Sequence, residues 1–110
     1  MIIRVFRAVA KPGQLPALEA KFRGSFFSSV RAHPGLLALL PGRPVDATGR
    51  EFTMITIWDS PASLETFTGP DWHRSVIPTG ALSALESCTV EHFDFYGDPA
   101  TDPLPGPPAA

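Results

Sequence analysis

The chain has 110 residues, of which 44% are hydrophobic, and its nine Lys and Arg against eleven Asp and Glu give a formal net charge of −2. This length allows one domain, and the scattered charges exclude the basic stripe of a nucleic-acid-binding protein. A single cysteine rules out an intrachain disulfide, and no stretch resembles a signal peptide or reaches the roughly 18 apolar residues of a membrane span, so we expect a cytoplasmic protein without membrane or nucleic-acid partners.

The first part of the chain predicts a strand, a helix and a second strand. Residues 2–10 form an apolar strand that a Lys-Pro-Gly turn closes. Residues 15–33 have helical spacing, because apolar side chains recur every three or four positions. These are Leu15, Leu18, Phe22, Phe26 and Val30. Pro34 and Gly35 end the helix, and residues 36–40 form a short apolar strand.

A hairpin loop, a third strand and a second helix follow. Residues 41–49 contain the turn formers of a hairpin loop. Residues 50–58 form a strand with apolar side chains on both faces, so neither face is suited to water. Asp59 and Ser60 are N-cap candidates for a helix over residues 61–67.

The rest of the chain predicts a helical segment, a last strand and a tail. Asp71 caps a helical segment that continues, around Pro78, to Glu86. Residues 89–96 form the last strand. Residues 98–110 contain five prolines and no aromatic residue, which predicts a disordered tail behind a domain of residues 1–97.

This order of elements predicts an α+β fold, the ferredoxin-like βαββαβ arrangement with a four-stranded antiparallel sheet. Two helices cover only one face of such a sheet. The other face would also be apolar, for example at Ile3, Val5 and Val9, and would exceed the few hundred Å² that monomers usually expose. We therefore expect a homodimer in which a second copy covers this sheet face.

A series of short motifs runs in order over residues 1–97. These are MIIRVFRAVAKPG at the start, His-Pro-Gly at 33–35, Ile-Trp-Asp-Ser at 57–60, Phe67, GPDWHRSVIP at 69–78 and the closing VEHFDFYG. Their order and spacing resemble the antibiotic biosynthesis monooxygenase (ABM) domain family, whose members are dimeric α+β barrels. The resemblance implies several activities, since the family contains cofactor-independent oxygenases of anthrone-like phenols and quinols, haem-degrading enzymes and proteins without a known role.

Two departures from the family pattern bear on the chemistry. The oxygenase and haem-degrading branches use an asparagine and a helical tryptophan nine residues after the strand tryptophan. Counting from Trp58, that position is Phe67, and the chain has no asparagine. The haem-binding histidine of the family falls at Ile77. The resemblance therefore implies a monooxygenase that uses no haem, metal or flavin and oxidises a small aromatic polyketide-like or quinol substrate with dioxygen.

Two histidines are the candidate catalytic residues. Such an oxygenase needs a base, a donor for the substrate oxyanion and dry apolar walls. His73 stands beside Trp72 at the start of a predicted helical segment, and imidazole titrates near neutral pH. His92 lies on the last strand, on the same face as Tyr96. The alternatives are a solvated His73 and a His92 that serves only to form a hydrogen bond across the sheet or across the dimer interface.

Arg4 and Arg7 are candidates for binding the substrate oxyanion. They occupy opposite faces of a strand that should be central, so we expect at least one to be buried and to need a partner. Because the last strand pairs with the first in this fold, Glu91 or Asp94 would be that partner, and a structural ion pair is the alternative to oxyanion binding.

The remaining candidates are mainly aromatic. Trp72, Phe67 and Phe22 are predicted to wall a substrate pocket together, and Trp58 is a further wall candidate or a core residue. Tyr96 is added as a substrate contact because it shares the face of His92. His33 is interpreted as a cation at a helix C-terminus, and Cys88 as a small buried apolar residue.

Motifs for zinc hydrolysis, serine hydrolysis, dinucleotide binding and phosphate binding are all missing from the sequence. Three functions remain open. The first is the cofactor-independent monooxygenase. A cyclase or isomerase would use the same pocket and base without oxygen, and a non-catalytic dimeric domain would only bind a small molecule.

Overall fold

The computed structural model describes residues 1–97, and the predicted tail lies outside the described residues. Its elements are β1 (Ile2–Ala10), α1 (Leu15–Lys21), η1 (Phe22–Phe26), α2 (Phe27–Arg31), β2 (Leu36–Gly42), β3 (Glu51–Trp58), α3 (Pro61–Thr68), η2 (Ala81–Ala84) and β4 (Leu85–Asp94). The predicted α+β fold is confirmed, because the four strands form one antiparallel sheet in the ferredoxin-like order β2-β3-β1-β4. No helix within residues 1–97 is long and apolar enough to cross a membrane.

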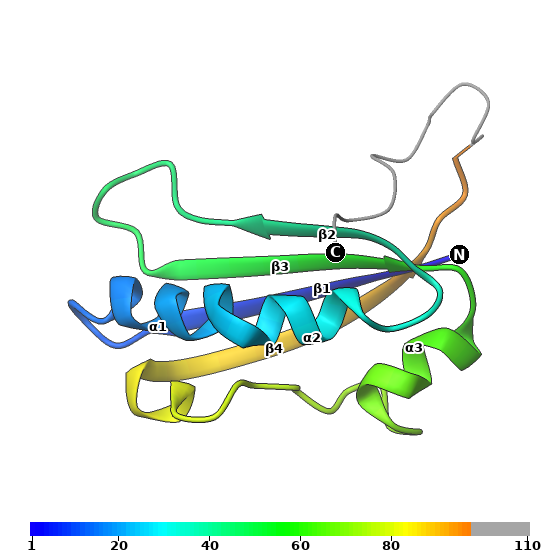
Figure 1. The fold of residues 1–110 in the computed structure, drawn as a ribbon. Coiled ribbons are helices and arrows are strands. Elements are labelled where there is room, and N and C mark those ends of the chain that lie inside the picture. The colour runs from blue at the N-terminus through cyan, green and yellow to red at the C-terminus, as the bar shows by residue number, and fades with distance from the viewer. Residues whose placement is uncertain (98–110) are drawn as a thin grey trace.

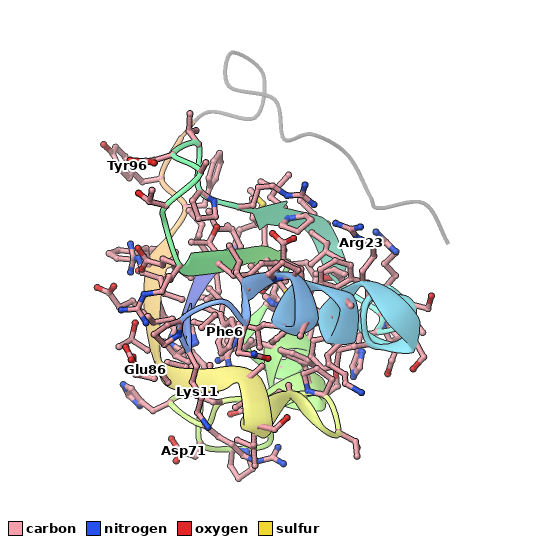
Figure 2. The ribbon with its side chains drawn as sticks, turned by 90° about the vertical axis from the view of Figure 1, so that its left-hand side faces the viewer. Phe6, Lys11, Arg23, Asp71, Glu86 and Tyr96 are labelled. Carbon is pink, nitrogen blue, oxygen red and sulfur yellow. The ribbon has the colours of Figure 1, made fainter. Side chains whose placement is uncertain are left out.

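The helices lie on one side of the sheet (Figure 1). α1, η1 and α2 run along the strands, and α3 lies at the end where β3 finishes. Strand periodicity places alternate residues of β1 against the helices, and Figure 2 shows Phe6 pointing into the space between the two layers. The core between the layers is completed by Leu18, Phe22, Val30, Met54, Trp58 and Leu64, all fully buried or nearly so.

The first helical region contains a π-turn at its middle. The predicted helix over residues 15–33 is present to Arg31, but Gly24 departs from helical backbone with a ψ of −138°. A π-turn adds one residue to the helix and rotates the buried stripe by one position. As a result Phe27 is buried while Phe26 is only partly buried, although the helical period favours Phe26.

The predicted helical segment from Asp71 to Glu86 is wrong over its first ten residues. Residues 71–74 form a single turn, in which the Asp71 carboxylate accepts from the His73 amide at 3.0 Å and the Asp71 carbonyl accepts from the Arg74 amide at 3.1 Å. Pro78 lacks the N–H that a continuing helix needs. Only the short η2 is helical there, and β4 begins at Leu85, four residues before the predicted start.

Gly35 joins α2 to β2 in a conformation that only glycine adopts without strain. Its φ is +86°, and a Cβ built there would meet Ser63 Oγ at 2.2 Å. We expect Gly35→Ala to lower the free energy of unfolding by about 2 kcal/mol or more, since left-handed backbone costs roughly 1–2 kcal/mol and the clash adds to it. Urea denaturation measures this difference. Gly13→Ala is the matched control, because Gly13 has a φ of +75° with open space around its Cβ position; equal losses in both variants would contradict the clash.

The sheet face away from the helices carries a central apolar area. Val5 of β1 and Ile55 of β3 are paired in register at its centre, and both are half-buried. Phe93 of β4 is 49% exposed and Leu40 of β2 is 40% exposed. No helix within residues 1–97 covers this face (Figure 1).

Candidate functional site

Arg4 is the centre of a polar cluster on the helix side of the sheet. Strand β1 carries it into the core, where its side chain is only 1% exposed. Its Nη1 donates to the Trp72 carbonyl at 2.6 Å and its Nη2 donates to the Arg74 carbonyl at 2.9 Å. Nη1 also lies 3.1 Å from Nε2 of His92. One guanidinium thus ties the turn at residues 71–74 to both β1 and β4.

Among residues 1–97, no acidic group balances the charge of Arg4. Within residues 1–97 no carboxylate forms a salt bridge with it, and its Nε is buried without a partner there. Its neighbours are carbonyls, the His92 ring and the Phe67 ring, whose centroid lies 5.5 Å from Cζ. Burial lowers the pKa of Arg4 to about 10, which still leaves a cation at neutral pH. The cluster is therefore a preformed region of positive potential.

His92 receives a hydrogen bond from this cation. The register of β1 with β4 places His92 opposite Arg4. Because an arginine only donates, Nε2 of His92 must be the acceptor, and the neutral ring then carries its proton on Nδ1. Burial, the charge of Arg4 and the charge of His73 all lower the pKa of His92, burial being the largest cause. At neutral pH His92 is therefore a neutral ring with an Nδ1–H available to donate.

Two further rings complete the cluster. The Trp72 and His92 centroids are 5.5 Å apart, and the His73 and His92 centroids are 6.0 Å apart with the rings nearly perpendicular. His73 is 85% exposed and its Nδ1 lies 3.7 Å from the Asp71 carboxylate. The structure thus brings both predicted catalytic histidines together, with His73 at the solvent side and His92 beneath it.

The lowered pKa of His92 predicts a pH effect on stability. Between its folded pKa and the ordinary value of about 6.5, the unfolded chain binds a proton that the folded chain does not. We therefore expect the contribution of His92 to the free energy of unfolding to fall as the pH drops below about 6.5. Denaturant titrations of the wild type and His92→Gln, from pH 8 to pH 5, measure it. Parallel pH profiles for the two proteins would contradict it.

An aromatic stack joins this cluster to the helices. Trp58 is fully buried and stacks on Phe67, with centroids 5.6 Å apart and an angle of 19°. Phe26 lies 6.5 Å from Phe67, and the His33 ring meets Phe67 edge-on at 5.5 Å. Nδ1 of His33 lies 3.0 Å from the Ser29 carbonyl, which confirms its predicted place at the helix C-terminus.

An open groove lies between the first helical region and residues 77–79. Its volume is about 540 Å³, and its lining includes Lys21, Ser25, Phe26 and Ile77. Phe26 is thus shared by the groove and the stack. The segment that supplies Ile77 is also the one that Arg4 holds at Trp72 and Arg74. A flat molecule in this groove would lie along a wall whose position depends on Arg4.

Three predicted site residues lie apart from this arrangement. Arg7 faces the other side of the sheet, where its partly exposed side chain forms an ion pair with Glu91 and lies 3.9 Å from Glu51. The carboxylate partner was expected for the buried arginine, but the buried Arg4 forms no salt bridge within residues 1–97. Phe22 is fully buried and reaches Phe67 only through Phe26. Tyr96 follows β4 and projects into solvent (Figure 2).

Some residues of the cluster were not predicted from the sequence. The carbonyls of Trp72 and Arg74 matter because they satisfy Arg4, and backbone acceptors leave no residue-specific signal. Phe26 was assigned only to the helix core, since the π-turn that brings it to the groove is not visible in the helical period. Cys88, predicted as a small buried residue, is partly buried, with its sulfur 3.3 Å from Ser75 Oγ. Within residues 1–97 no group of three His, Cys, Asp or Glu side chains is placed to hold a metal ion.

Comparison with solved structures finds the same fold in several bacterial proteins. PA3566 from Pseudomonas aeruginosa superposes with a TM-score of 0.69 at 20% identity, covering 87% of this chain and 94% of its own. SO0527 from Shewanella oneidensis gives 0.68 at 21% identity, covering 84% and 87%. The haem degrader MhuD from Mycobacterium tuberculosis gives 0.63 at 22% identity, covering 89% and 98%. At these identities the likeness concerns the fold alone.

Comparison of the sequence identifies the family. No curated protein matches it. The family model described as antibiotic biosynthesis monooxygenase matches residues 1–77, which agrees with the resemblance of the motifs. Since this match covers most of the 110 residues, the chain belongs to the antibiotic biosynthesis monooxygenase family.

Proposed function

We propose that this protein is a monooxygenase that uses no metal, haem or flavin and oxidises a small, flat aromatic polyketide-like or quinol substrate with dioxygen. Family membership supports an oxygenase, and the contact between Arg4 and His92, next to the exposed ring of His73, is the observation that carries the proposal. Such a reaction needs a substrate anion next to positive potential in a place with little water.

The residues of the cluster divide the chemistry between them. His73 is the base, because it is the histidine whose ring is open to an incoming substrate. His92 donates its Nδ1–H to the oxyanion that forms. Arg4 is a positioning residue, since its own donors are directed at carbonyls and at His92. Trp72 and Phe67 supply apolar surface for the substrate ring.

The overall reaction balances without a cofactor. His73 removes a proton from the substrate, and the resulting anion passes one electron to dioxygen. The two radicals combine to a peroxide at the substrate carbon, and loss of water leaves a new carbonyl. For an anthrone-type methylene, one oxygen atom enters the product and the other leaves as water.

Oxygen consumption by metal-free protein tests this function. We expect uptake with a panel of anthrones and quinols, and a loss of at least about tenfold in His73→Ala, since a general base contributes roughly 10²- to 10⁴-fold. His92→Ala should lose a similar factor. His33→Gln is the matched control, because His33 is held at the end of α2 by backbone carbonyls.

The same assay separates the alternatives. Product formation without oxygen would replace the proposal by a cyclase or isomerase with the same base. Uptake that is unchanged in both alanine variants would keep the oxygenase and discard the assigned roles. A non-catalytic binding domain would bind the aromatic ligand with equal affinity before and after both substitutions.

We also propose that the protein is a homodimer in which a second copy covers the open sheet face. The fold of this family is commonly dimeric. The apolar area centred on Val5 and Ile55 supports the proposal, and a stable dimer needs roughly 800 Å² per partner. The same face on both copies would meet, as in any two-fold interface.

Ile55→Lys is expected to convert the dimer to a monomer. It places a charge at the centre of the interface, and a desolvated, unpaired charge should raise the dissociation constant by about 30-fold or more. Sedimentation velocity over a dilution series measures the change. The control is Leu82→Lys, because Leu82 is 68% exposed on η2, away from the sheet. A wild-type protein that sediments as a monomer at micromolar concentration contradicts the proposal.

A further inference from the structure

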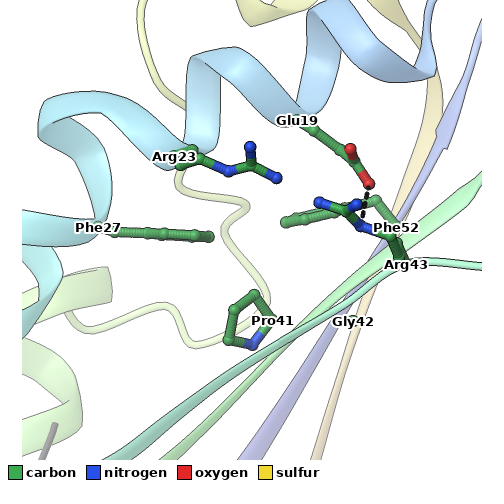
Figure 3. Close-up of a pocket in the computed structure, with 7 residues that line it drawn as sticks. All are labelled: Glu19, Arg23, Phe27, Pro41, Gly42, Arg43 and Phe52. Atoms are coloured by element: carbon green, nitrogen blue, oxygen red, sulfur yellow. Dashed lines mark ion pairs between the residues drawn. The ribbon is translucent and has the colours of Figure 1, made fainter.

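A second cavity lies on the other side of the first helical region, between it and the edge of the sheet at β2 and β3 (Figure 3). Its volume is about 120 Å³. This is below the roughly 300–1,000 Å³ of most small-molecule sites and close to the roughly 150 Å³ of an engineered protein cavity that binds benzene, so the ligand is limited to about one ring. It is lined by Phe27 and Phe52, by Pro41, and by the charged side chains of Glu19, Arg23 and Arg43.

The walls of this cavity are held in place by the core. Phe52 is 4% exposed, and its ring centroid lies 4.9 Å from that of Phe22. Phe27 is 6% exposed and lies 6.4 Å from Phe22. Both rings therefore pack on one fully buried side chain. Walls that are already ordered lose little conformational entropy when a ligand enters.

The mouth of the cavity carries a net positive charge. Glu19 forms an ion pair with Arg43, in which Oε1 of Glu19 lies 3.3 Å from Nε of Arg43. The side chain of Glu19 is only 15% exposed. Arg23 forms no salt bridge within residues 1–97, and Figure 3 shows its guanidinium above the two rings, on the same side as that ion pair. Two guanidinium groups thus face one carboxylate.

We propose that this cavity binds a planar, one-ring aromatic monoanion, such as an aryl carboxylate. The ring enters between Phe27, Phe52 and Pro41, and the anionic group meets Arg23 and the free edge of Arg43. A guanidinium fits a carboxylate in two-point contact. The cavity is separate from the Arg4–His92 cluster, so its binding does not depend on the proposed oxygenase activity. Phe52 in its wall pairs with Ala8, which is four residues along β1 from Arg4.

A titration of the full chain with sodium benzoate, followed by NMR of the backbone amides, tests the proposal. We expect saturable shifts at Arg23, Phe27, Gly42 and Phe52, with a dissociation constant in the millimolar range. Acetate carries the charge without the ring, and benzyl alcohol carries the ring without the charge. Both should bind at least about tenfold more weakly. Shifts of equal size with acetate, or shifts confined to other residues, would overturn the proposal.

Charge variants make the test specific. Arg23→Gln should weaken benzoate binding by about fivefold or more, since it removes a charge-assisted contact that is partly screened by solvent. Glu19→Gln should strengthen binding by about two- to fivefold, because it removes the competing carboxylate. Lys21→Gln is the matched control on the same helical region, where Lys21 lines the opposite groove. If Arg23→Gln and Lys21→Gln weakened benzoate binding equally, the effect would come from the net charge of the protein and the proposed site would be overturned.

Discussion

Trp58→Ala is expected to lower the free energy of unfolding by about 3–5 kcal/mol. The side chain is fully buried at the end of β3, and it stacks on Phe67 while its Nε1–H donates to the Thr56 hydroxyl at 2.9 Å. Its removal leaves a cavity and takes a hydrogen-bond partner from Thr56, which is itself fully buried. Since domains of this size are stable by roughly 5–15 kcal/mol, the variant should be near its unfolding midpoint in mild denaturant.

Urea denaturation of the two single variants Trp58→Ala and Trp72→Ala compares the loss of stability at a buried and at a partly buried tryptophan. Trp72 is only partly buried, so the same truncation there should cost much less, about 1–2 kcal/mol. Trp58→Phe keeps most of the stacking surface and should fall between the two. If Trp72→Ala proved as destabilising as Trp58→Ala, the turn at residues 71–74 would contribute more to the core than the burial of its side chains indicates.

Arg4→Met is expected to release the turn at residues 71–74 and to lower the free energy of unfolding by about 2–4 kcal/mol. The carbonyls of Trp72 and Arg74 each lose their donor, and since both hydrogen bonds are partly buried, each loss costs up to about 1–3 kcal/mol. Part of this loss is offset because a buried cation no longer has to be desolvated. Hydrogen exchange should therefore accelerate at the Arg74 amide, because its hydrogen bond to the Asp71 carbonyl closes the turn.

Measurements on two variants distinguish the hydrogen-bonding and charge role of Arg4 from simple packing. The pKa of His92 should rise in Arg4→Met, since the neighbouring charge that lowers it is gone, and an NMR titration of the imidazole measures this. Arg4→Lys keeps the charge but cannot reach two carbonyls and a ring nitrogen at once. It should leave the pKa of His92 closer to the wild-type value while the turn still loosens. A pKa of His92 that is unchanged in Arg4→Met would mean that burial and the charge of His73 set it without Arg4.

Much of the fold could be predicted because its signals are local. The alternation of β1, the spacing of the first helix and the Ser60 N-cap of α3, whose hydroxyl accepts from the Ser63 amide at 3.2 Å, each depend on residues close in the chain. The order of these elements then admits few arrangements, which is why the sheet order followed from the sequence. The carboxylate partner expected for the buried arginine was wrong, because Arg4 is the buried one and bonds to carbonyls and His92, while the more exposed Arg7 pairs with Glu91.

The wrongly predicted helix after Asp71 shows the limit of signals from residues close in the chain. Asp71 does accept the amide hydrogen bond expected of a cap, from His73. The chain leaves the helix after this turn, where Pro78 lacks an amide donor, and the Trp72 carbonyl accepts instead from Arg4, 68 residues away. The candidate site has the same origin. His92 lies 88 residues from Arg4, and only the pairing of β1 with β4 brings their side chains together.

The sequence by itself determined most of the elements, the fold class and the family, since hydrophobic periodicity and turn residues act over a few positions. It also identified His73 and His92 as candidates by residue type alone. The tertiary structure decided which of them is covered, what Arg4 contacts and where the two cavities lie. These properties depend on distances between residues far apart in the chain, and such distances exist only once the helices pack on the sheet.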